Sequence, residues 1–418
     1  MGLFEPGLRP ARHHGGTGVA RIVLLLRALA VPLATGCTAL FLGGAATGAA
    51  ADQDDGAWPE PKQILVWSPA RRLRAFSDYA GTFPTRPVRA GGRAHPLPPA
   101  LRDLAALSYD LEGERYSLDD FVRETHIAGL IVVHGGRVRY ERYELGNDPS
   151  TLWVSYSIAK SVVSLLYGAA LADGYVESLD DPVVRYLPRL AGGAYDQVTI
   201  EQLLQMSSGV AWNEDYEDPE ADVSQSPIAI LPFLDYMRAL PTAAPPGTRF
   251  NYSTGETSLA GAVLRAAIGN NLATYLSHRI WRPFGMEADA NWMIGAPGGA
   301  EYGGCCISAT LRDYARIGLF ALAEGTAGDG QRLLPHGWMA RSTTPADTNA
   351  GYGYFWWLRP DGTYAALGIF GQMIWIDPRS GTVVAMHSAW PRATDARLSA
   401  HRWAMVEAIA AALAAGDS

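Results

Sequence analysis

Residues 153–173, WVSYSIAKSVVSLLYGAALAD, constrain this chain more than any other stretch. Ser157 and Lys160 stand three residues apart near its start, and apolar residues then recur at helical spacing: Val162, Leu165, Leu166 and Ala169. The pattern predicts a core helix that buries one face and whose first turn opens towards a cleft. Because residues three apart share a helix face, we expect the Ser157 hydroxyl and the Lys160 amine within hydrogen-bond reach.

A serine hydroxyl with an amine beside it is the pair that nucleophilic catalysis needs, since the amine can take the hydroxyl proton. Lysine stands only at positions 62 and 160 among the 34 basic residues. Burial and the helix dipole both disfavour the ammonium form, so a lysine at this place can be neutral near neutral pH, whereas an arginine cannot. A Ser-x-x-Lys spacing also arises by chance, but its position before an apolar helix favours a catalytic role for Ser157 and Lys160.

The first 51 residues differ from the rest. Four arginines precede an uncharged run at residues 28–51 that ends in small residues, which is the layout of an export signal cleaved near Ala51. The run is also long enough for an uncleaved membrane anchor, and Cys37 fits a poor lipoprotein signal. We therefore expect residues 1–51 to be a signal peptide or membrane anchor, and the protein to be exported.

Charge and cysteine content exclude some classes of protein. The formal net charge is −8 and no Lys/Arg cluster is present, so nucleic-acid binding is not expected. Cys305 and Cys306 are sequence neighbours, which implies no disulfide framework and favours two small buried hydrophobic residues. The histidines show no metal-ligand spacing, so we expect neither a metal nor a cofactor.

The order of predicted elements indicates an α+β fold. Residues 52–104, rich in Pro, Gly and Arg, have no sustained period and predict an extended arm, after which regular structure begins in a domain over 105–418. Strand patterns occur at 127–144, around the turn at His134, and again in several runs between 352 and 387, with helices between them. These strands predict one antiparallel sheet built from both ends of the domain, flanked by helices, and an inserted, mostly helical lobe.

Two further tyrosines are candidate site residues. Tyr216 lies in an acidic loop, residues 212–226, of the kind that carries specificity at a cleft rim, although a surface tyrosine without a role is about as consistent. Tyr252 precedes a predicted helix, where nearby cations would favour the phenolate and let it relay a proton. Core packing of Phe250 and Tyr252 is the alternative for this stretch.

Three motifs in order resemble the serine beta-lactamase and penicillin-binding superfamily. They are Ser157-Ile158-Ala159-Lys160 as Ser-x-x-Lys, Tyr252-Ser253-Thr254 as Tyr-x-Asn, and Ala366-Leu367-Gly368 at the Lys-Thr-Gly strand. The resemblance covers roughly residues 105–415 and is nearest to the class C and esterase-like branch, in particular to the nylon-oligomer (aminohexanoate-dimer) hydrolases. It implies a beta-lactamase/transpeptidase-like fold, with Ser157, Lys160 and Tyr252 catalytic.

The resemblance also implies an oxyanion hole made by the backbone N–H groups of Ser157 and Ile369, with Tyr216, Thr254 and Gly368 as substrate-binding candidates. Two positions depart from the family motifs. Thr254 replaces the usual Asn, and Ala366 replaces the Lys or His that binds a substrate carboxylate in penicillin-recognising enzymes. The departures favour cleavage of a small-molecule ester or linear amide through an acyl-enzyme. The alternatives are a D-Ala-D-Ala peptidase, a beta-lactamase, or a non-catalytic envelope binding protein of the same fold.

Overall fold

A six-stranded antiparallel sheet joins the two ends of the domain. Its strand order is β5-β4-β12-β11-β10-β9, and the pairing of β12 with β4 brings the C-terminal strands beside the N-terminal hairpin. The strands are β4 (Ile127–His134), β5 (Arg137–Tyr143), β9 (Trp357–Leu358), β10 (Tyr364–Gly368), β11 (Gln372–Asp377) and β12 (Thr382–Ser388). The computed structural model describes residues 58–104 and 106–415. The predicted sheet from both ends of the domain is confirmed.

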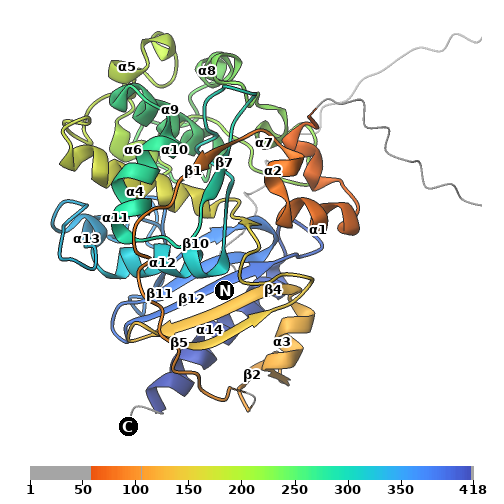
Figure 1. Cartoon of the computed structure of the whole chain (residues 1–418). Coiled ribbons are helices and arrows are strands. Elements are labelled where there is room, and N and C mark those ends of the chain that lie inside the picture. The colour runs from red at the N-terminus through yellow and green to blue at the C-terminus, as the bar shows by residue number, and fades with distance from the viewer. Residues whose placement is uncertain (1–57, 105, 416–418) are drawn as a thin grey trace, which may run out of the picture. The chain divides into compact units, whose positions relative to one another are not determined.

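Helices cover both faces of this sheet (Figure 1). On one face, α12 (Leu311–Leu322) packs against β4, β11 and β12. A Cβ on Gly318 of this helix would lie 2.5 Å from Val383 Cγ1, so glycine allows the close approach of helix and sheet. The other face carries α14 (Ala396–Ala415) and α3 (Leu118–Glu124), which contact each other.

The inserted lobe is mostly helical, as predicted, and lies between β6 and β7 in the chain (Figure 1). Thr199 caps α6 in a capping box with Gln202, and Ser253 caps α9. The helical segments of the lobe are α5 (Val183–Tyr186), η2 (Pro188–Leu190), α6 (Ile200–Leu204), α7 (Asp222–Gln225), α8 (Ile230–Ala239), α9 (Thr254–Ile268), α10 (Leu272–Leu276), η3 (Ser277–Trp281) and α11 (Arg282–Phe284). One short helix, α13 (Trp338–Ser342), and the turn η4 (Ile369–Gly371) lie later in the chain.

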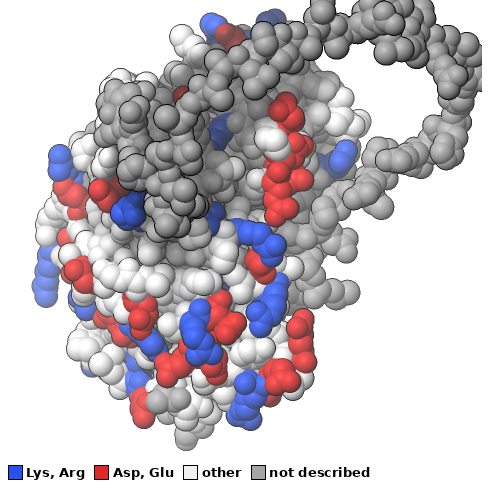
Figure 2. All heavy atoms as spheres, turned by 90° about the vertical axis from the view of Figure 1, so that its right-hand side faces the viewer, with Lys and Arg blue, Asp and Glu red and all other residues white. Residues whose placement is uncertain are grey.

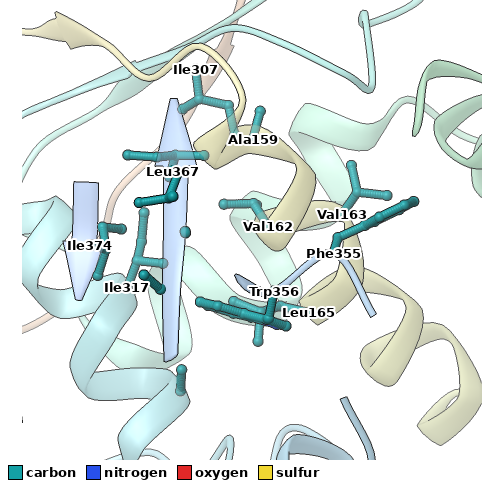
Figure 3. Close-up of a cluster of buried hydrophobic side chains, with 14 of the residues drawn as sticks. Ala159, Val162, Val163, Leu165, Ile307, Ile317, Phe355, Trp356, Leu367 and Ile374 are labelled. Atoms are coloured by element: carbon teal, nitrogen blue, oxygen red, sulfur yellow. The ribbon is translucent and has the colours of Figure 1, made fainter. Parts of the chain in front are cut away.

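The helix predicted after Ser157 is α4 (Ile158–Ala172), and it is buried nearly all round rather than along one face. Contacts with α9 on one side and with β10 and β11 on another explain this burial. Figure 3 shows Ala159, Val162 and Leu165 of α4 in the cluster that also contains Leu367 of β10 and Ile374 of β11. The helix that carries Lys160 is therefore held rigidly between the sheet and the lobe.

Residues 58–88 correct one prediction. Instead of an extended arm, they form η1 (Pro61–Leu65), α1 (Pro69–Ser77), α2 (Tyr79–Thr82) and β1 (Thr85–Val88). Phe76 of α1 packs edge-on against Trp153 and Tyr156, with ring centroids 5.6 and 5.5 Å apart. The sequence did not predict these helices because each is too short to show a sustained hydrophobic period. Aromatic contacts hold them in place. The prediction that regular structure begins only after residue 104 is thus wrong.

A second sheet, which the sequence patterns did not predict, has the order β1-β7-β8-β6. It connects the N-terminal segment to the strand that leads into Ser157, through β6 (Trp153–Val154), β7 (Ala290–Met293) and β8 (Ile307–Ala309). A separate hairpin pairs β2 (Ser108–Leu111) with β3 (Glu114–Ser117).

Charged side chains of both signs are interspersed on the face drawn in Figure 2. Many of the charges are paired, as in the contacts of Arg142 Nη1 with Asp119 and of Arg142 Nε with Glu144, at 2.5 and 2.7 Å. Within the described residues, no helix is long and apolar enough to cross a membrane. The predicted signal or anchor at residues 1–51, with Cys37, lies outside them, so export stays a prediction.

Candidate active site

Ser157 lies at a tight turn between β6 and α4. Tyr156 just before it has a positive φ of 46°, a conformation that non-glycine residues adopt rarely and that surrounding contacts must hold. Ser155 supplies such contacts, since its N–H donates to the Ile307 carbonyl at 2.7 Å and its hydroxyl accepts from the Ile307 N–H at 2.8 Å. Ser157 occupies the N-cap position of α4, yet its hydroxyl makes no capping hydrogen bond. The hydroxyl is therefore available to other partners.

Lys160 is that partner, as the spacing predicts. Its Nζ lies 3.0 Å from Ser157 Oγ, and it also contacts Thr254 Oγ1 at 3.0 Å and the Gly304 carbonyl at 2.8 Å. The side chain is buried, and this burial lowers the pKa of Lys160 to about 8, although the carboxylate of Glu214 acts in the opposite direction. With a pKa of about 8, roughly a tenth of Lys160 is neutral at pH 7 and more at higher pH, so the neutral amine that a general base requires is accessible.

Tyr252 reaches the same hydroxyl from the segment before α9. Its side chain is hydrogen-bonded to Ser157, its ring stacks on Trp357 at 5.5 Å, and Lys160 Nζ lies 5.4 Å from the ring centroid. Burial and the nearby Glu214 carboxylate raise the pKa of Tyr252 well above its usual value, and the hydrogen bond to Ser157 offsets only part of this. The prediction that nearby cations favour the phenolate is therefore wrong. Tyr252 is a neutral phenol that can pass a proton but does not start as the base.

Thr254 and Glu214 complete the polar contacts around Lys160. Thr254 Oγ1 accepts from Lys160 and donates to Glu214, whose carboxylate also accepts the Thr254 N–H at 2.9 Å. The Tyr216 hydroxyl donates to the same carboxylate at 2.6 Å, as does the Trp212 indole. The sequence did not identify Glu214, because it is one of several acidic residues in a polar loop. The alternation of Trp212, Glu214 and Tyr216 was the available signal, since alternate residues of an extended segment share a side.

A pocket opens beside Ser157, with about 550 Å³ of empty space that includes open solvent at its mouth. Ser157, Tyr216, Thr254 and Ile369 are among its lining residues, so it brings together most of the predicted site. The rest of the wall comes from the N-terminal segment, the lobe and the second sheet: Pro61, Lys62, Ile64, Leu65, Tyr79, Tyr156, Val223, Ile228, Met293, Tyr302, Gly304, Cys305 and Cys306. Its mostly apolar lining suits a small organic ligand.

The pocket wall contains a disulfide between neighbouring cysteines, Cys305 and Cys306. The prediction that Cys305 and Cys306 are two unlinked, small buried hydrophobic residues is therefore wrong. Gly304 directly precedes them, and its carbonyl is the one that accepts from Lys160. The pair therefore borders both the pocket and the support of the candidate base.

Comparison with known proteins decides the family. The family model described as Beta-lactamase matches residues 118–407, more than half of the chain. The chain belongs to the beta-lactamase family. It is 29% identical over 356 residues to a 6-aminohexanoate-dimer hydrolase of Paenarthrobacter ureafaciens, covering 78% of this chain and 87% of that protein. The esterase EstB of Burkholderia gladioli is 28% identical over 214 residues, covering 44% of this chain and 52% of EstB.

Solved structures agree on the fold. A Bacillus anthracis protein that is provisionally named a 6-aminohexanoate-dimer hydrolase matches with a TM-score of 0.73 and 21% identity, covering 84% of this chain and 97% of that one. A class C beta-lactamase from Rhodobacter sphaeroides matches with a TM-score of 0.52 and 18% identity over 70% of this chain and 97% of that one. The predicted α+β class and the resemblance to the serine beta-lactamase superfamily are confirmed, and the chain is a hydrolase of this family.

Gly368 is the last residue of β10, and Ile369 begins the turn η4 that follows. Ile369 lines the pocket, whereas Gly368 is not among the described lining residues. A Cβ on Gly368 would lie 2.3 Å from the Ser155 carbonyl oxygen. Gly368 therefore lets β10 approach the segment that leads into Ser157, and its role in substrate binding stays a prediction.

We expect Gly368→Val to lower kcat for ester hydrolysis by about a hundredfold or more, because displacing β10 from Ser155 separates the two predicted oxyanion donors. The melting temperature should fall as well, since the clash is with backbone. Ile369→Val keeps the N–H and should leave kcat and melting temperature near wild type. Full activity in a destabilised Gly368→Val variant would show that the spacing of β10 and Ser157 does not matter for the reaction.

Proposed function

We propose that this protein hydrolyses a carboxylic ester or a linear amide through an acyl-enzyme on Ser157. The observation that carries the proposal is the 3.0 Å contact between Ser157 Oγ and the buried amine of Lys160, whose pKa is lowered to about 8. A hydroxyl held against an amine that is partly neutral at physiological pH is an activated nucleophile. Its position on the wall of the pocket gives a small substrate access to it.

Acylation begins when neutral Lys160 takes the Ser157 proton as Oγ attacks the substrate carbonyl carbon. The negative charge that develops on the carbonyl oxygen is then stabilised by the N–H groups of Ser157 and Ile369. When the carbon–oxygen or carbon–nitrogen bond breaks, the leaving group needs a proton. Tyr252 is hydrogen-bonded to Ser157 and is held neutral by burial, so its phenol can donate this proton and regain one from Lys160.

Deacylation reverses these roles. A water molecule gives its proton to the same groups as its oxygen attacks the acyl carbon, and Ser157 leaves with a proton restored. The Glu214–Thr254 contacts support this cycle, because they hold the Lys160 amine in place on the side away from the serine. The relatives include, by name, a 6-aminohexanoate-dimer hydrolase and an esterase, which supports hydrolysis of a small linear substrate and of an ester.

Labelling with a fluorophosphonate tests the proposal directly, because only an activated serine reacts with it. We expect one adduct, mapped by mass spectrometry to the peptide that contains Ser157, and no adduct after Ser157→Ala. An adduct on another serine would refute the assignment. Short incubation with a slow ester should also leave the corresponding acyl group on this peptide.

We expect nitrocefin and benzylpenicillin to be poor substrates compared with 4-nitrophenyl acetate or butyrate. Penicillin-recognising members of the resembled superfamily bind the substrate carboxylate through a Lys or His at the position of Ala366, and Ala366 is a buried residue of β10 with no charge to offer. A single charged hydrogen bond is worth about tenfold or more in kcat/KM. Equal kcat/KM for beta-lactams and esters would contradict this prediction and favour the beta-lactamase or D-Ala-D-Ala peptidase alternative.

A further inference from the structure

The wall of the pocket beside Ser157 includes a segment that precedes the part of the chain matched by the family model. Residues Pro61, Lys62, Ile64 and Leu65 belong to η1, whereas the match begins at residue 118. The segment is held near Ser157 by the packing of Phe76 on Trp153, Tyr156 and Phe370. Substrate selection by this wall would therefore depend on residues outside the stretch that the family model matches.

Lys62 supplies a cation to that wall. Its Nζ donates to the hydroxyl of Ser226 at 3.0 Å and to the Ser226 carbonyl, and within residues 58–415 both partners of Nζ are atoms of Ser226. An ammonium has three N–H donors, so one remains for a ligand. Burial lowers the pKa of Lys62 to about 8, while the carboxylates of Glu214, Glu60 and Asp222 act in the opposite direction. Lys62 is therefore largely charged at pH 7.

The three carboxylates are not among the lining residues of the pocket, and the wall near this cation is mostly apolar. Ile64 and Leu65 come from η1, Val223 and Ile228 from the lobe, and Met293 from β7. Such side chains favour a hydrocarbon chain over a polar one, because the chain leaves water on binding. A cation on this mostly apolar wall favours ligands that carry one anionic group. The same pocket contains the nucleophile.

We propose that Lys62 determines specificity by binding a carboxylate carried by an apolar chain of the substrate whose ester or amide bond Ser157 attacks. This rests on the proposed function, and it extends that function to one substrate class. The position of Ala366 lacks the cation that binds a carboxylate in penicillin-recognising enzymes. Lys62 lies in a different segment from Ala366. It would therefore bind a carboxylate at a different place along the substrate, as a linear ester or amide can present it.

The test compares esters that differ only in a terminal carboxylate. In the first arm the carboxylate is on the acyl side, as in mono-4-nitrophenyl adipate against 4-nitrophenyl hexanoate. In the second it is on the leaving side, as in the butyryl ester of 6-hydroxyhexanoate against hexyl butyrate. Each pair is assayed with wild type, Lys62→Met and Lys62→Arg. Arg74→Met is the matched control, because Arg74 is an exposed residue of the neighbouring α1 and does not line the pocket.

We expect Lys62→Met to lower kcat/KM for the carboxylate ester of one arm by about tenfold to a hundredfold, mainly through a higher KM. The neutral ester of that arm should change by less than about twofold, Lys62→Arg should retain most of the preference, and Arg74→Met should change neither ester. The arm that responds identifies the side of the scissile bond on which the carboxylate lies.

Two results would overturn the proposal. One is an equal loss on charged and neutral esters in Lys62→Met, which would make Lys62 only a structural tie to Ser226. The other is an unchanged rate on the carboxylate esters of both arms. Failure of the proposed function is a separate result, since it requires Ser157→Ala to keep hydrolysing the neutral esters. Hydrolysis that depends on Ser157 but ignores the carboxylate rejects the role of Lys62 alone.

Discussion

Ser157→Ala should lower kcat/KM for 4-nitrophenyl butyrate by about 10⁴-fold or more, because no other group can form the acyl-enzyme once the nucleophile is removed. The fold should survive. The substitution deletes one oxygen, and the lost hydrogen bond is worth about 1 kcal/mol, which shifts the melting temperature of a domain this large by only about 2–4 °C. Steady-state kinetics and a thermal melt on the same preparation check both parts.

The matched control for this variant is Ser161→Ala, one turn further along α4. The Ser161 hydroxyl donates to the Phe355 carbonyl at 2.6 Å, so its loss should cost stability and little activity. Substantial hydrolysis by Ser157→Ala, with normal melting, would mean that another residue is the nucleophile. Residual activity that fluorophosphonate abolishes at substoichiometric amounts would come from contaminating wild type or another serine hydrolase rather than from the variant.

Lys160→Arg should lower kcat/KM by about a thousandfold even though it keeps a positive charge. A guanidinium stays protonated at any working pH, so it cannot take the Ser157 proton, and general bases of this kind contribute about 10²–10⁴-fold. The site also leaves little room for a larger group, since Lys160 Nζ is held between Ser157, Thr254 and the Gly304 carbonyl within 3.0 Å. The melting temperature reports any general loss of structure.

The pH profile separates a base from a purely electrostatic role. Because burial lowers the pKa of Lys160 to about 8, the neutral base form increases as the pH rises through this value. We expect kcat/KM of the wild type to rise between about pH 7 and 8 and to level off above about 9. Lys160→Arg should lose this rise. A wild-type profile that falls over the same range, or near-normal activity in Lys160→Arg, would show that Lys160 acts as a cation.

The structure gives a physical reason for Thr254 at the position where the family motif has Asn. A substrate-binding role was predicted for Thr254 because the family motif has Asn there, and the residue does line the pocket. Its hydroxyl is nonetheless engaged by Lys160 and Glu214. A shorter hydroxyl side chain can both accept from an amine and donate to a carboxylate, so Thr254 links the candidate base to Glu214.

The sequence alone predicted the features that depend on residues close together in the chain. Ser157 and Lys160 meet because three residues span less than one helical turn, and this geometry holds wherever the helix is placed. Thr199 and Thr310 cap helices by the same kind of local contact, since each side-chain oxygen accepts from an N–H within the same turn. The central sheet followed from short apolar runs bounded by turns, and its strands β4, β10, β11 and β12 are buried on both faces.

Tertiary structure alone decided what burial and distant segments contribute. Tyr252 is neutral because the folded protein removes it from water, and no neighbour in the sequence signals that. Glu214 reaches Thr254 across 40 residues, and Lys62 reaches Ser226 across 164, so both contacts arise only when separate segments are packed together. Short-range patterns specify helices, caps and the serine–lysine pair, whereas the protonation states and the pocket wall depend on desolvation and packing between segments far apart in the chain.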